Sequence, residues 1–387
     1  MRNYPIYITK GEVPFSPQEA GYEKERLSVL DQHLKNLISK DMIQSASYCL
    51  ARDNKTFVHK ALGYLNYKEE DGRPFLPDSV YGIYSITKLV TAVAILQLVE
   101  DGILRLDQPV GEILEEFKDA PFDKIQVWHL LTHTSGLYCD EGCKPDKYHE
   151  STNQLMKSTN WINRLLSKGL SSEPGNEWAY SSLGYNVLGE IITRSTGVFA
   201  HDYINERVLK VCDMQDTHWV YTTKYKERYS SRFDWMDWYI EQADQNLERK
   251  ANKVPRTWNG LLSTDADLMK FGTMLLNYGK YNGKHVLGRK AVEALKRNQI
   301  PADVKNFCWG ANGANNPYGL GPTFQAETNR SQLVTPGTIN HEGWGTSCLM
   351  IDYEEKFVAV WSAQFVGDNW SMLPLRNVAS IIWSGII

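Results

Sequence analysis

One segment of the chain constrains the fold more than any other, because it is apolar nearly all round. Between residues 84 and 101 an almost continuous apolar run extends from Leu89 to Val99, a length typical of a helix. Gly102 follows as a natural C-terminal stop. A helix without a polar face must be covered by other elements on every side. The sequence therefore predicts a central, buried helix inside a large folded unit.

The same segment opens with a serine and a lysine three positions apart, in the run Ser85-Ile86-Thr87-Lys88. This spacing places the hydroxyl and the amine on one helix face, within reach of each other. The amine can take the hydroxyl proton, and the first N–H groups of the helix favour developing negative charge. Roughly one or two Ser-x-x-Lys matches are expected by chance in a chain of 387 residues, so the pattern needs support from elsewhere.

Composition excludes several classes of protein. The net charge of −4 comes without a basic stripe, so we expect no nucleic-acid partner. We find no apolar stretch long enough for a membrane span and no signal-peptide pattern, so we expect a cytoplasmic protein without a membrane partner. The six cysteines are scattered, and we expect free thiols in such a compartment. Cys139 and Cys143 share a loop, but no second Cys or His pair lies nearby to complete a metal site.

The periodicity of apolar residues predicts helices and strands at both ends of the chain and a mostly helical middle. The predicted helices span residues 23–39, 84–101, 264–278, 288–297 and 373–382, and the predicted strands span residues 45–52, 56–64, 346–352 and 356–365. Length alone suggests two or three domains, although large α/β enzymes often form one unit. We predict a single domain over 1–387, with an α/β part at about 1–80 and 255–387 and a mostly helical part at about 81–254.

Residues 222–254 are rich in charged and aromatic side chains but show weak periodicity. Two interpretations stay open for this segment. It forms a surface flap or lid over a site, or it forms a solvated pair of helices.

Two further clusters follow the serine at large distances along the chain. In the first, a Pro-Gly turn precedes Tyr180-Ser181-Ser182, which enters a helix predicted from Leu183 to Ile192, so Tyr180 and Ser182 can project into a cleft. In the second, His341-Glu342-Gly343-Trp344 reads as the start of a strand, where Gly343 allows a backbone or ligand to approach closely.

Together these clusters resemble the serine β-lactamase and penicillin-binding-protein-like superfamily, on its class C side. Ser85 to Lys88 matches the first motif of that group, Tyr180 to Ser182 its Tyr-x-Asn motif, and His341 to Gly343 its Lys/His-x-Gly motif. Supporting matches are the runs His129 to Leu137, Gly260 to Thr264 and Tyr318 to Gly321. The resemblance covers residues 20 to 385 and implies an antiparallel sheet flanked by helices, with an all-helical subdomain.

The resemblance also implies a role for each matched residue. Ser85 would be the acylated nucleophile, and Lys88 would help to deprotonate it. Tyr180, as a phenolate or through Lys88, would act as base and return a proton to the leaving group. The backbone N–H groups of Ser85 and Trp344 would form the oxyanion hole. His341 would line the far wall and bind the tyrosine or a substrate carboxylate.

Three departures from the family pattern bear on the substrate. Ser182 stands where β-lactamases usually have Asn, and its hydroxyl is shorter and carries no NH2 group. A helix N-cap is an equally good interpretation of Ser182. His341 stands where efficient class C enzymes use Lys, and a histidine is only partly charged near neutral pH. Trp344 would line the oxyanion position with a bulky ring. These departures favour an ester or a small amide over a β-lactam.

Other polar residues are given structural interpretations. His129 and His133 have the spacing of a zinc pair, but Leu130 follows where a metalloprotease motif has Glu, so we expect no metal. Ser263 and Thr264 look like a helix N-cap. We expect no organic cofactor.

The sequence therefore predicts a serine hydrolase that acts on a small-molecule ester or amide, as a carboxylesterase or amidase. Three alternatives stay open. The first is a D,D-peptidase, D-amino-acid amidase or penicillin-binding protein, and the second is an acyltransferase. The third is a degenerate binding module, which would be expected to lack Ser85, Lys88 or Tyr180.

Overall fold

A seven-stranded antiparallel sheet forms the larger half of the computed structural model. The structure describes residues 4–143, 158, 160–245, 254–325, 332–344, 347–366 and 373–387, with only the backbone of 373–376. The strand order is β1-β3-β2-β13-β12-β11-β10. The strands are β1 (Ile8–Lys10), β2 (Ile43–Arg52), β3 (Lys55–Gly63), β10 (Thr323–Phe324), β11 (Ile339–Gly343), β12 (Ser347–Asp352) and β13 (Phe357–Phe365).

The centre of this sheet joins strands from opposite ends of the chain. β2 pairs antiparallel with β13, and the hydroxyl oxygens of Ser47 and Ser362 lie 2.7 Å apart across that pair. The prediction that the two chain ends build one sheet is therefore confirmed, as is the fold class. One local prediction was wrong, because His341 to Gly343 close strand β11 instead of opening a strand.

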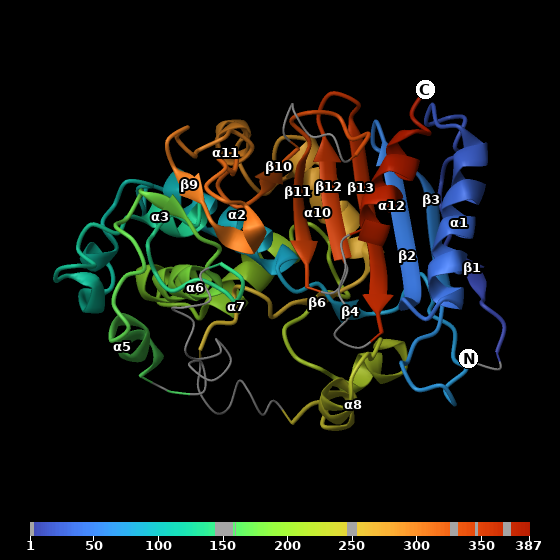
Figure 1. Cartoon of the computed structure of the whole chain (residues 1–387), viewed down its shortest axis with the longest axis horizontal. Helices are drawn as coiled ribbons and strands as arrows, with labels where there is room; N and C mark the ends of the chain where they lie inside the picture. The colour runs from blue at the N-terminus through green and yellow to red at the C-terminus, as the bar shows by residue number, and fades with distance from the viewer. Residues whose placement is uncertain are drawn as a thin grey trace.

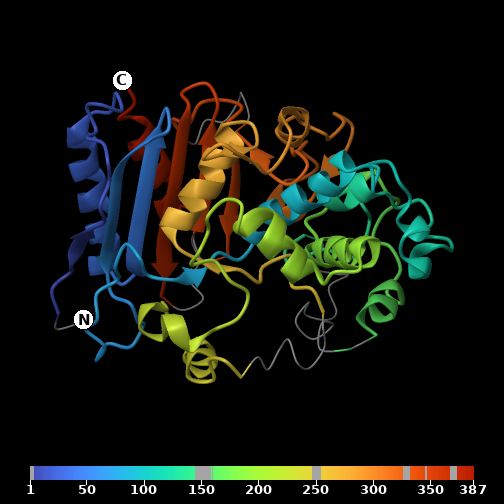
Figure 2. The same ribbon diagram turned by 180° about the vertical axis from the view of Figure 1, so that it is seen from behind.

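Helices cover both faces of the sheet (Figures 1 and 2). α1 (Lys24–Ser39) and α12 (Leu373–Trp383) pack on one face, while α10 (Asp265–Leu276) packs on the other. α1 presents a buried stripe at helical spacing that includes Leu27, Leu30 and Leu34. Thr264 caps α10, since its side chain accepts a hydrogen bond from the backbone N–H of Asp267. The N-cap prediction for this helix is confirmed.

The other half of the molecule is mainly helical (Figure 1), and it also includes elements from 289–310, a stretch that was expected in the α/β part. Its helices are α2 (Ile86–Glu100), α3 (Val127–Leu131), α5 (Trp161–Leu166), α6 (Ser182–Thr196), α7 (Ala200–Ile204) and α11 (Arg289–Leu295). Short helical turns are η1 (Val110–Glu112), η2 (Glu115–Phe117), η4 (Asn205–Leu209) and η6 (Cys308–Gly310). Two-stranded pairs are β4 (Tyr81–Gly82) with β6 (Leu262–Ser263), β5 (Glu177–Trp178) with β9 (Lys305–Asn306), and β7 (Lys280–Tyr281) with β8 (Lys284–His285).

Helix α2 lies between the two halves, as its all-round apolar sequence predicts. It packs against α6 and α7 of the helical half and against β11 and β12 of the sheet. Thirteen of its fifteen residues are buried, including Lys88 near its start. A lysine is unusual in such apolar surroundings, because burial disfavours its charged form.

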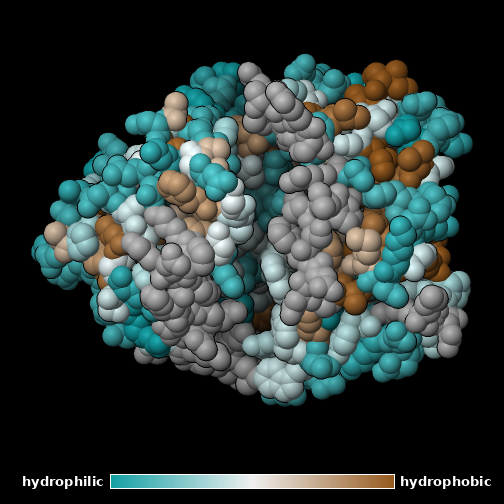
Figure 3. Space-filling view, in the orientation of Figure 1, coloured by the Kyte–Doolittle hydropathy of each residue, from teal (hydrophilic) through white to brown (hydrophobic). Residues whose placement is uncertain are grey.

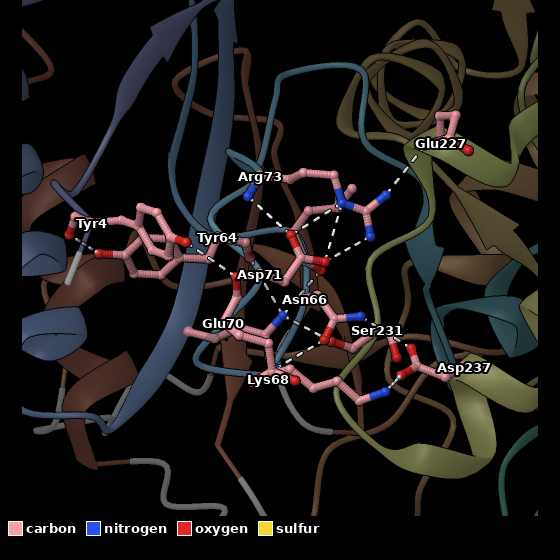
Figure 4. A network of polar contacts seen from close by, with 12 residues as sticks. Tyr4, Tyr64, Asn66, Lys68, Glu70, Asp71, Arg73, Glu227, Ser231 and Asp237 are labelled. Carbon is pink, nitrogen blue, oxygen red and sulfur yellow. Dashed lines mark hydrogen bonds and ion pairs between the residues drawn. The ribbon is translucent and has the colours of Figure 1, made fainter. Parts of the chain in front are cut away.

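The segment 222–254, for which a lid and a helix pair were both considered, is described as far as residue 245. It contains a short 3-10 helix, η5 (Thr223–Arg228), and α8 (Asp234–Glu241). A network of polar contacts holds it against the loop that follows β3 (Figure 4). Lys68 pairs with Asp237 at 2.8 Å, and Arg73 pairs with Glu227 at 3.3 Å. Closure of this segment over a substrate stays a prediction, and residues 246–253 lie outside the described part.

In the part of the chain that the structure describes, none of the helices has the length and apolar character needed to cross a bilayer.

Candidate active site

A sharp turn places Ser85 at the start of α2. Tyr84 adopts the left-handed backbone conformation with φ of 43°, which is uncommon for a residue with a side chain. The chain thereby passes directly from β4 into the helix, and Ser85 sits at the N-cap position, half-buried. The hydroxyl is presented where the first N–H groups of the helix favour negative charge.

Lys88 lies one helical turn further on and is fully buried beside the serine. Its Nζ donates to Ser85 Oγ at 2.9 Å and to the backbone carbonyl of Trp258 at 3.1 Å. Burial lowers the pKa of Lys88 to about 7, although the carboxylate of Asp140 acts in the opposite direction. Near neutral pH a substantial share of the amine is therefore unprotonated and able to accept the serine proton.

The Trp258 carbonyl is held in place by threonines of α2, a function that the sequence analysis missed. Thr91 Oγ1 donates to the carbonyl of Thr257 at 2.7 Å, and Thr87 Oγ1 accepts from the N–H of Leu261 at 3.2 Å. These two bonds fix the loop containing Trp258 along the helix. Thr87 and Thr91 lie four residues apart on one helix face, which was the available signal for such a contact.

Tyr180 approaches the same pair from the loop before α6. Lys88 Nζ lies 4.6 Å from the centre of the tyrosine ring, and the side chain of Ser85 is close enough to act on the pKa of the phenol. Burial holds the pKa of Tyr180 well above its ordinary value, and the neighbouring Tyr318 adds to this shift. Tyr180 therefore keeps its proton near neutral pH, which favours the interpretation in which the tyrosine works through Lys88.

His133 supports this loop, and neither histidine of the zinc-like pair has a metal-binding arrangement. The ring centres of His133 and Tyr180 are 4.3 Å apart, and His133 Nδ1 accepts the N–H of Ser181 at 3.0 Å. His129 Nδ1 accepts the N–H of Gln126 at 3.0 Å. Both rings thus accept a hydrogen bond from a backbone amide, His129 within its own turn and His133 from the loop that carries Tyr180.

Ser182 does not point freely into the site. Its N–H donates to Asp140 Oδ1 at 2.8 Å, and its hydroxyl donates to Asp140 Oδ2 at 2.5 Å. The N-cap of α6 is the preceding residue, Ser181, whose Oγ accepts from the N–H of Gly184. The N-cap interpretation of Ser182 was therefore wrong by one position. Asp140 itself was missed, because nothing in the sequence links it to a residue 42 positions further on.

The end of β11 lies against the turn that carries Ser85. A Cβ atom added to Gly343 would fall 2.3 Å from Ser347 Oγ and 2.5 Å from the carbonyl oxygen of Ile83, so only glycine fits there. This approach places the backbone of Trp344, which follows Gly343, beside the start of α2. The position agrees with the N–H role expected for Trp344, which stays a prediction.

His341 lies inside the same wall and is buried. Its Nδ1 lies 3.0 Å from the carbonyl oxygen of Glu342, and its Nε2 lies 3.5 Å from the hydroxyl of Tyr318. Burial, together with the nearby Lys88, lowers the pKa of His341 to about 3. The imidazole is therefore neutral near neutral pH and offers no positive charge to a substrate carboxylate.

Trp344 forms an aromatic wall with residues from the segment 222–254. Its ring stacks on Phe233 at 5.9 Å and meets Tyr84 edge-on at 5.4 Å, and the Arg232 guanidinium lies 5.0 Å from its centre. Trp344 is 48% exposed, so one side of this wall faces solvent. The aromatic residues of the segment 222–254 indicated a packing contact, but the sequence did not identify Trp344 as the partner.

One expectation about cysteines was wrong. Cys143 and Cys308 form a disulfide, although all six cysteines were expected as free thiols. The bond joins the loop of Asp140 to the turn that carries Trp309, whose ring lies 5.5 Å from that of Tyr180. The other four cysteines are buried and take no part in a disulfide. A pairing over 165 residues has no local signal in the sequence.

Removing this disulfide is expected to loosen both loops. We expect Cys143→Ser with Cys308→Ser to lower the free energy of unfolding by about 3 kcal/mol, because the crosslink restricts the unfolded chain. Urea unfolding of the oxidised protein, of the reduced protein and of the double variant measures this. An unchanged unfolding midpoint after complete reduction would contradict the expectation.

The described residues thus bring Ser85, Lys88 and Tyr180 together, with His341 and Asp140 close enough to interact electrostatically with Lys88. The space-filling view shows a cleft between the sheet half and the helical half, with hydrophilic surface visible in its depth (Figure 3). For residues 4–143, 158, 160–245 and the other described stretches, no cluster of three or more His, Cys, Asp or Glu side chains is suited to a metal.

Comparison with known proteins agrees with this architecture. A Salmonella agona protein with the provisional name D-alanyl-D-alanine carboxypeptidase is 23% identical, over 90% of this chain and 84% of its own length. A solved hydrolase with promiscuous acyltransferase activity superposes with a TM-score of 0.75 at 16% identity, covering 93% of this chain and 99% of its own. A penicillin-binding-protein homologue from Caulobacter crescentus gives 0.73 at 18% identity, covering 94% and 98%.

These structural likenesses establish the shared fold, while the family itself is established by sequence. The family model described as Beta-lactamase matches residues 30–377, a stretch that contains all three motifs and nearly the whole sheet. Members of this family are serine hydrolases, in agreement with a serine hydroxyl that contacts a buried amine. The chain therefore belongs to the beta-lactamase family.

Proposed function

We propose that the protein hydrolyses an ester or a small amide through an acyl-enzyme on Ser85. The observation that carries this proposal is the 2.9 Å contact between Lys88 Nζ and Ser85 Oγ, combined with a lysine pKa of about 7. An amine that is partly unprotonated near neutral pH and in contact with a hydroxyl is an arrangement that can activate a serine.

The reaction begins with proton transfer. Lys88 takes the proton of Ser85 Oγ while the oxygen attacks the carbonyl carbon of the substrate. Negative charge develops on the carbonyl oxygen, and the N–H groups of Ser85 and Trp344 stabilise it. Tyr180, which keeps its phenolic proton, passes this proton to the leaving group and regains one from Lys88. Water then releases the acyl group by the same steps in reverse.

We expect the protein to prefer an uncharged or cationic substrate over one that carries a carboxylate, because of the residues around His341. His341 is neutral, so it attracts a carboxylate only weakly. Glu342 follows it in the motif, and its negative charge acts on Tyr180. His341 would therefore offer little attraction to a β-lactam or to a peptide with a free C-terminal carboxylate.

One other function has a specific observation in its favour. The Salmonella agona relative carries a carboxypeptidase name, so hydrolysis of a peptide ending in D-alanine is the second candidate. The same acyl-enzyme would serve both reactions. The two candidates differ in whether a carboxylate on the leaving group improves turnover.

The test uses intact-protein mass spectrometry after mixing with p-nitrophenyl butyrate or, separately, with a fluorescent penicillin. We expect rapid ester turnover with a transient butyryl adduct, and slow or absent penicillin labelling. Ser85→Ala is the control and should show neither adduct nor turnover. Rapid, long-lived penicillin labelling would favour the peptidase candidate. Absence of any Ser85-dependent reaction would overturn both.

A further inference from the structure

The start of α6, just after Tyr180, is bonded to a carboxylate whose role the proposed mechanism leaves open. Asp140 is half-buried, and its N–H donates to the carbonyl of Tyr180 at 2.8 Å, so it lies next to the catalytic tyrosine. Both of its oxygens accept hydrogen bonds from Ser182. A carboxylate offers about four acceptor positions, so two remain for another donor. Electrostatic coupling to Lys88 places this charge close to the reacting groups.

An aromatic surface lies against the loop that carries this carboxylate. The backbone N–H of Trp309 donates to the carbonyl of Gly142 at 2.8 Å. The indole ring covers Gly142, since a Cβ atom added to that glycine would lie 2.8 Å from Trp309 Cδ1. The Trp309 side chain is 60% exposed, and its ring lies 5.5 Å from that of Tyr180. Asp140 and Trp309 thus both lie against Tyr180, and a carboxylate combined with aromatic rings can bind an organic cation.

The two loops that supply these groups are fastened together. β5 pairs with β9, and the disulfide joins Cys143 to Cys308, the residue before Trp309. The positions of Asp140 and Trp309 relative to Tyr180 are therefore fixed before any substrate arrives. Preorganised groups bind a ligand at a lower cost in conformational entropy.

We propose that Asp140 and Trp309 bind an ammonium group carried by the ester or amide that Ser85 attacks. This inference rests on the proposed function and narrows its substrate to a cationic class. A substrate cation in this position also disfavours the protonated form of Lys88, which leaves the amine free to take the serine proton. The ammonium can belong to the acyl half, as in an amino-acid ester, or to the alcohol half, as in an aminoalkyl ester.

Matched ester pairs test the inference. For the acyl half, the methyl ester of α-aminobutyric acid, in both enantiomers, is compared with its N-acetyl derivative and with methyl butyrate. For the alcohol half, butyrylcholine is compared with its uncharged carbon isostere. We expect kcat/KM to favour the cationic member of at least one pair by about tenfold or more, mainly through KM.

The variant Asp140→Asn separates substrate binding from an effect on Lys88. Loss of the carboxylate removes an influence that raises the pKa of Lys88, so the acid limb of the pH profile should shift to lower pH for every ester. If Asp140 binds the ammonium group directly, the variant should also lose its preference for the cationic ester. The kcat/KM values for the two esters of a pair should then agree to within about twofold. This preference is the ratio of two kcat/KM values measured on the same protein preparation, so a fraction of unfolded protein does not change it.

Two further variants complete the test. Ser182→Ala keeps the carboxylate and should keep the preference for the cationic ester. Trp309→Leu should raise KM for that ester several-fold. Equal turnover of charged and uncharged esters by the wild type, or an undiminished preference in Asp140→Asn, would overturn this inference and leave the proposed function intact. Failure of every ester to react at Ser85 would overturn both.

Discussion

The variant Lys88→Met is expected to lower kcat/KM by about a thousandfold. The reason is that this amine is the base closest to the serine, with Nζ 2.9 Å from Ser85 Oγ, and general bases contribute factors of about 10²–10⁴. Tyr180 cannot replace it, because burial keeps the tyrosine protonated. Methionine has a similar length and no proton-accepting nitrogen, so it tests the chemistry with little change in volume. Steady-state kinetics with an ester substrate give the measurement.

The wild-type pH profile provides an independent check of the same role. Because the unprotonated amine is the active form, kcat/KM should rise with pH through about 7, the pKa of Lys88. The profile of Lys88→Met should lack this limb. Residual activity of the variant within tenfold of the wild type, with the limb retained, would exclude Lys88 as the base.

The same substitution should make the folded protein more stable, in contrast to its effect on activity. The folded pKa of about 7 lies below the ordinary value of 10.5, so between these values the unfolded chain holds a proton that the folded chain lacks. Stability therefore rises with pH across this window, and the cost of burying Lys88 is greatest below pH 7. Lys88→Met removes this cost, and we expect a gain on the order of 2 kcal/mol in acid that shrinks towards pH 10.5. Urea unfolding at several pH values measures it.

The second large effect is expected at Gly343. In Gly343→Ala the new methyl group would lie 2.5 Å from the carbonyl oxygen of Ile83, so the end of β11 must move away from the turn that carries Ser85. The two N–H groups proposed for the oxyanion hole then separate. Loss of one such donor costs about 10²–10³ in kcat. We expect kcat to fall by about a hundredfold while KM changes by only a few-fold.

A matched glycine variant provides the control. An added Cβ at Gly184, in helix α6, has its nearest neighbours at 3.7 Å, which is ordinary contact. Gly184→Ala therefore makes the same chemical change without the collision, and its kcat should stay within about threefold of the wild type. Equal kcat values for the Gly343 and Gly184 variants would contradict a role for this close approach.

Most of the fold could be predicted because its signals are local. The apolar run that forms α2 and the strand-like runs that form β2, β3, β12 and β13 can each be recognised within a short stretch of sequence. The residues gathered at the start of α2 were also predictable, since Ser85, Lys88, Tyr180 and His341 each belong to a recognisable motif. Their catalytic roles remain predictions until they are tested by substitution.

What the sequence could not provide was the partners of those residues. Ser182 looked like a substrate contact or a cap, but its hydroxyl is bound by Asp140 from a different loop. The pKa of His341 depends on burial that only the assembled wall creates. Arg232 reaches Trp344 from a segment with weak periodicity. Such pairings depend on tertiary packing, which short-range patterns do not encode.

The arrangement of the central strands has a consequence for synthesis of the chain. Ser47 in β2 and Ser362 in β13 face each other in the finished sheet but are separated by 315 residues in the sequence. During translation the long edge of β2 is therefore exposed until the last strand leaves the ribosome. Unpaired strand edges of this kind associate with other chains. The cell must protect this edge while the rest of the chain is made, so yield in the cell should depend on chaperones and on the speed of translation.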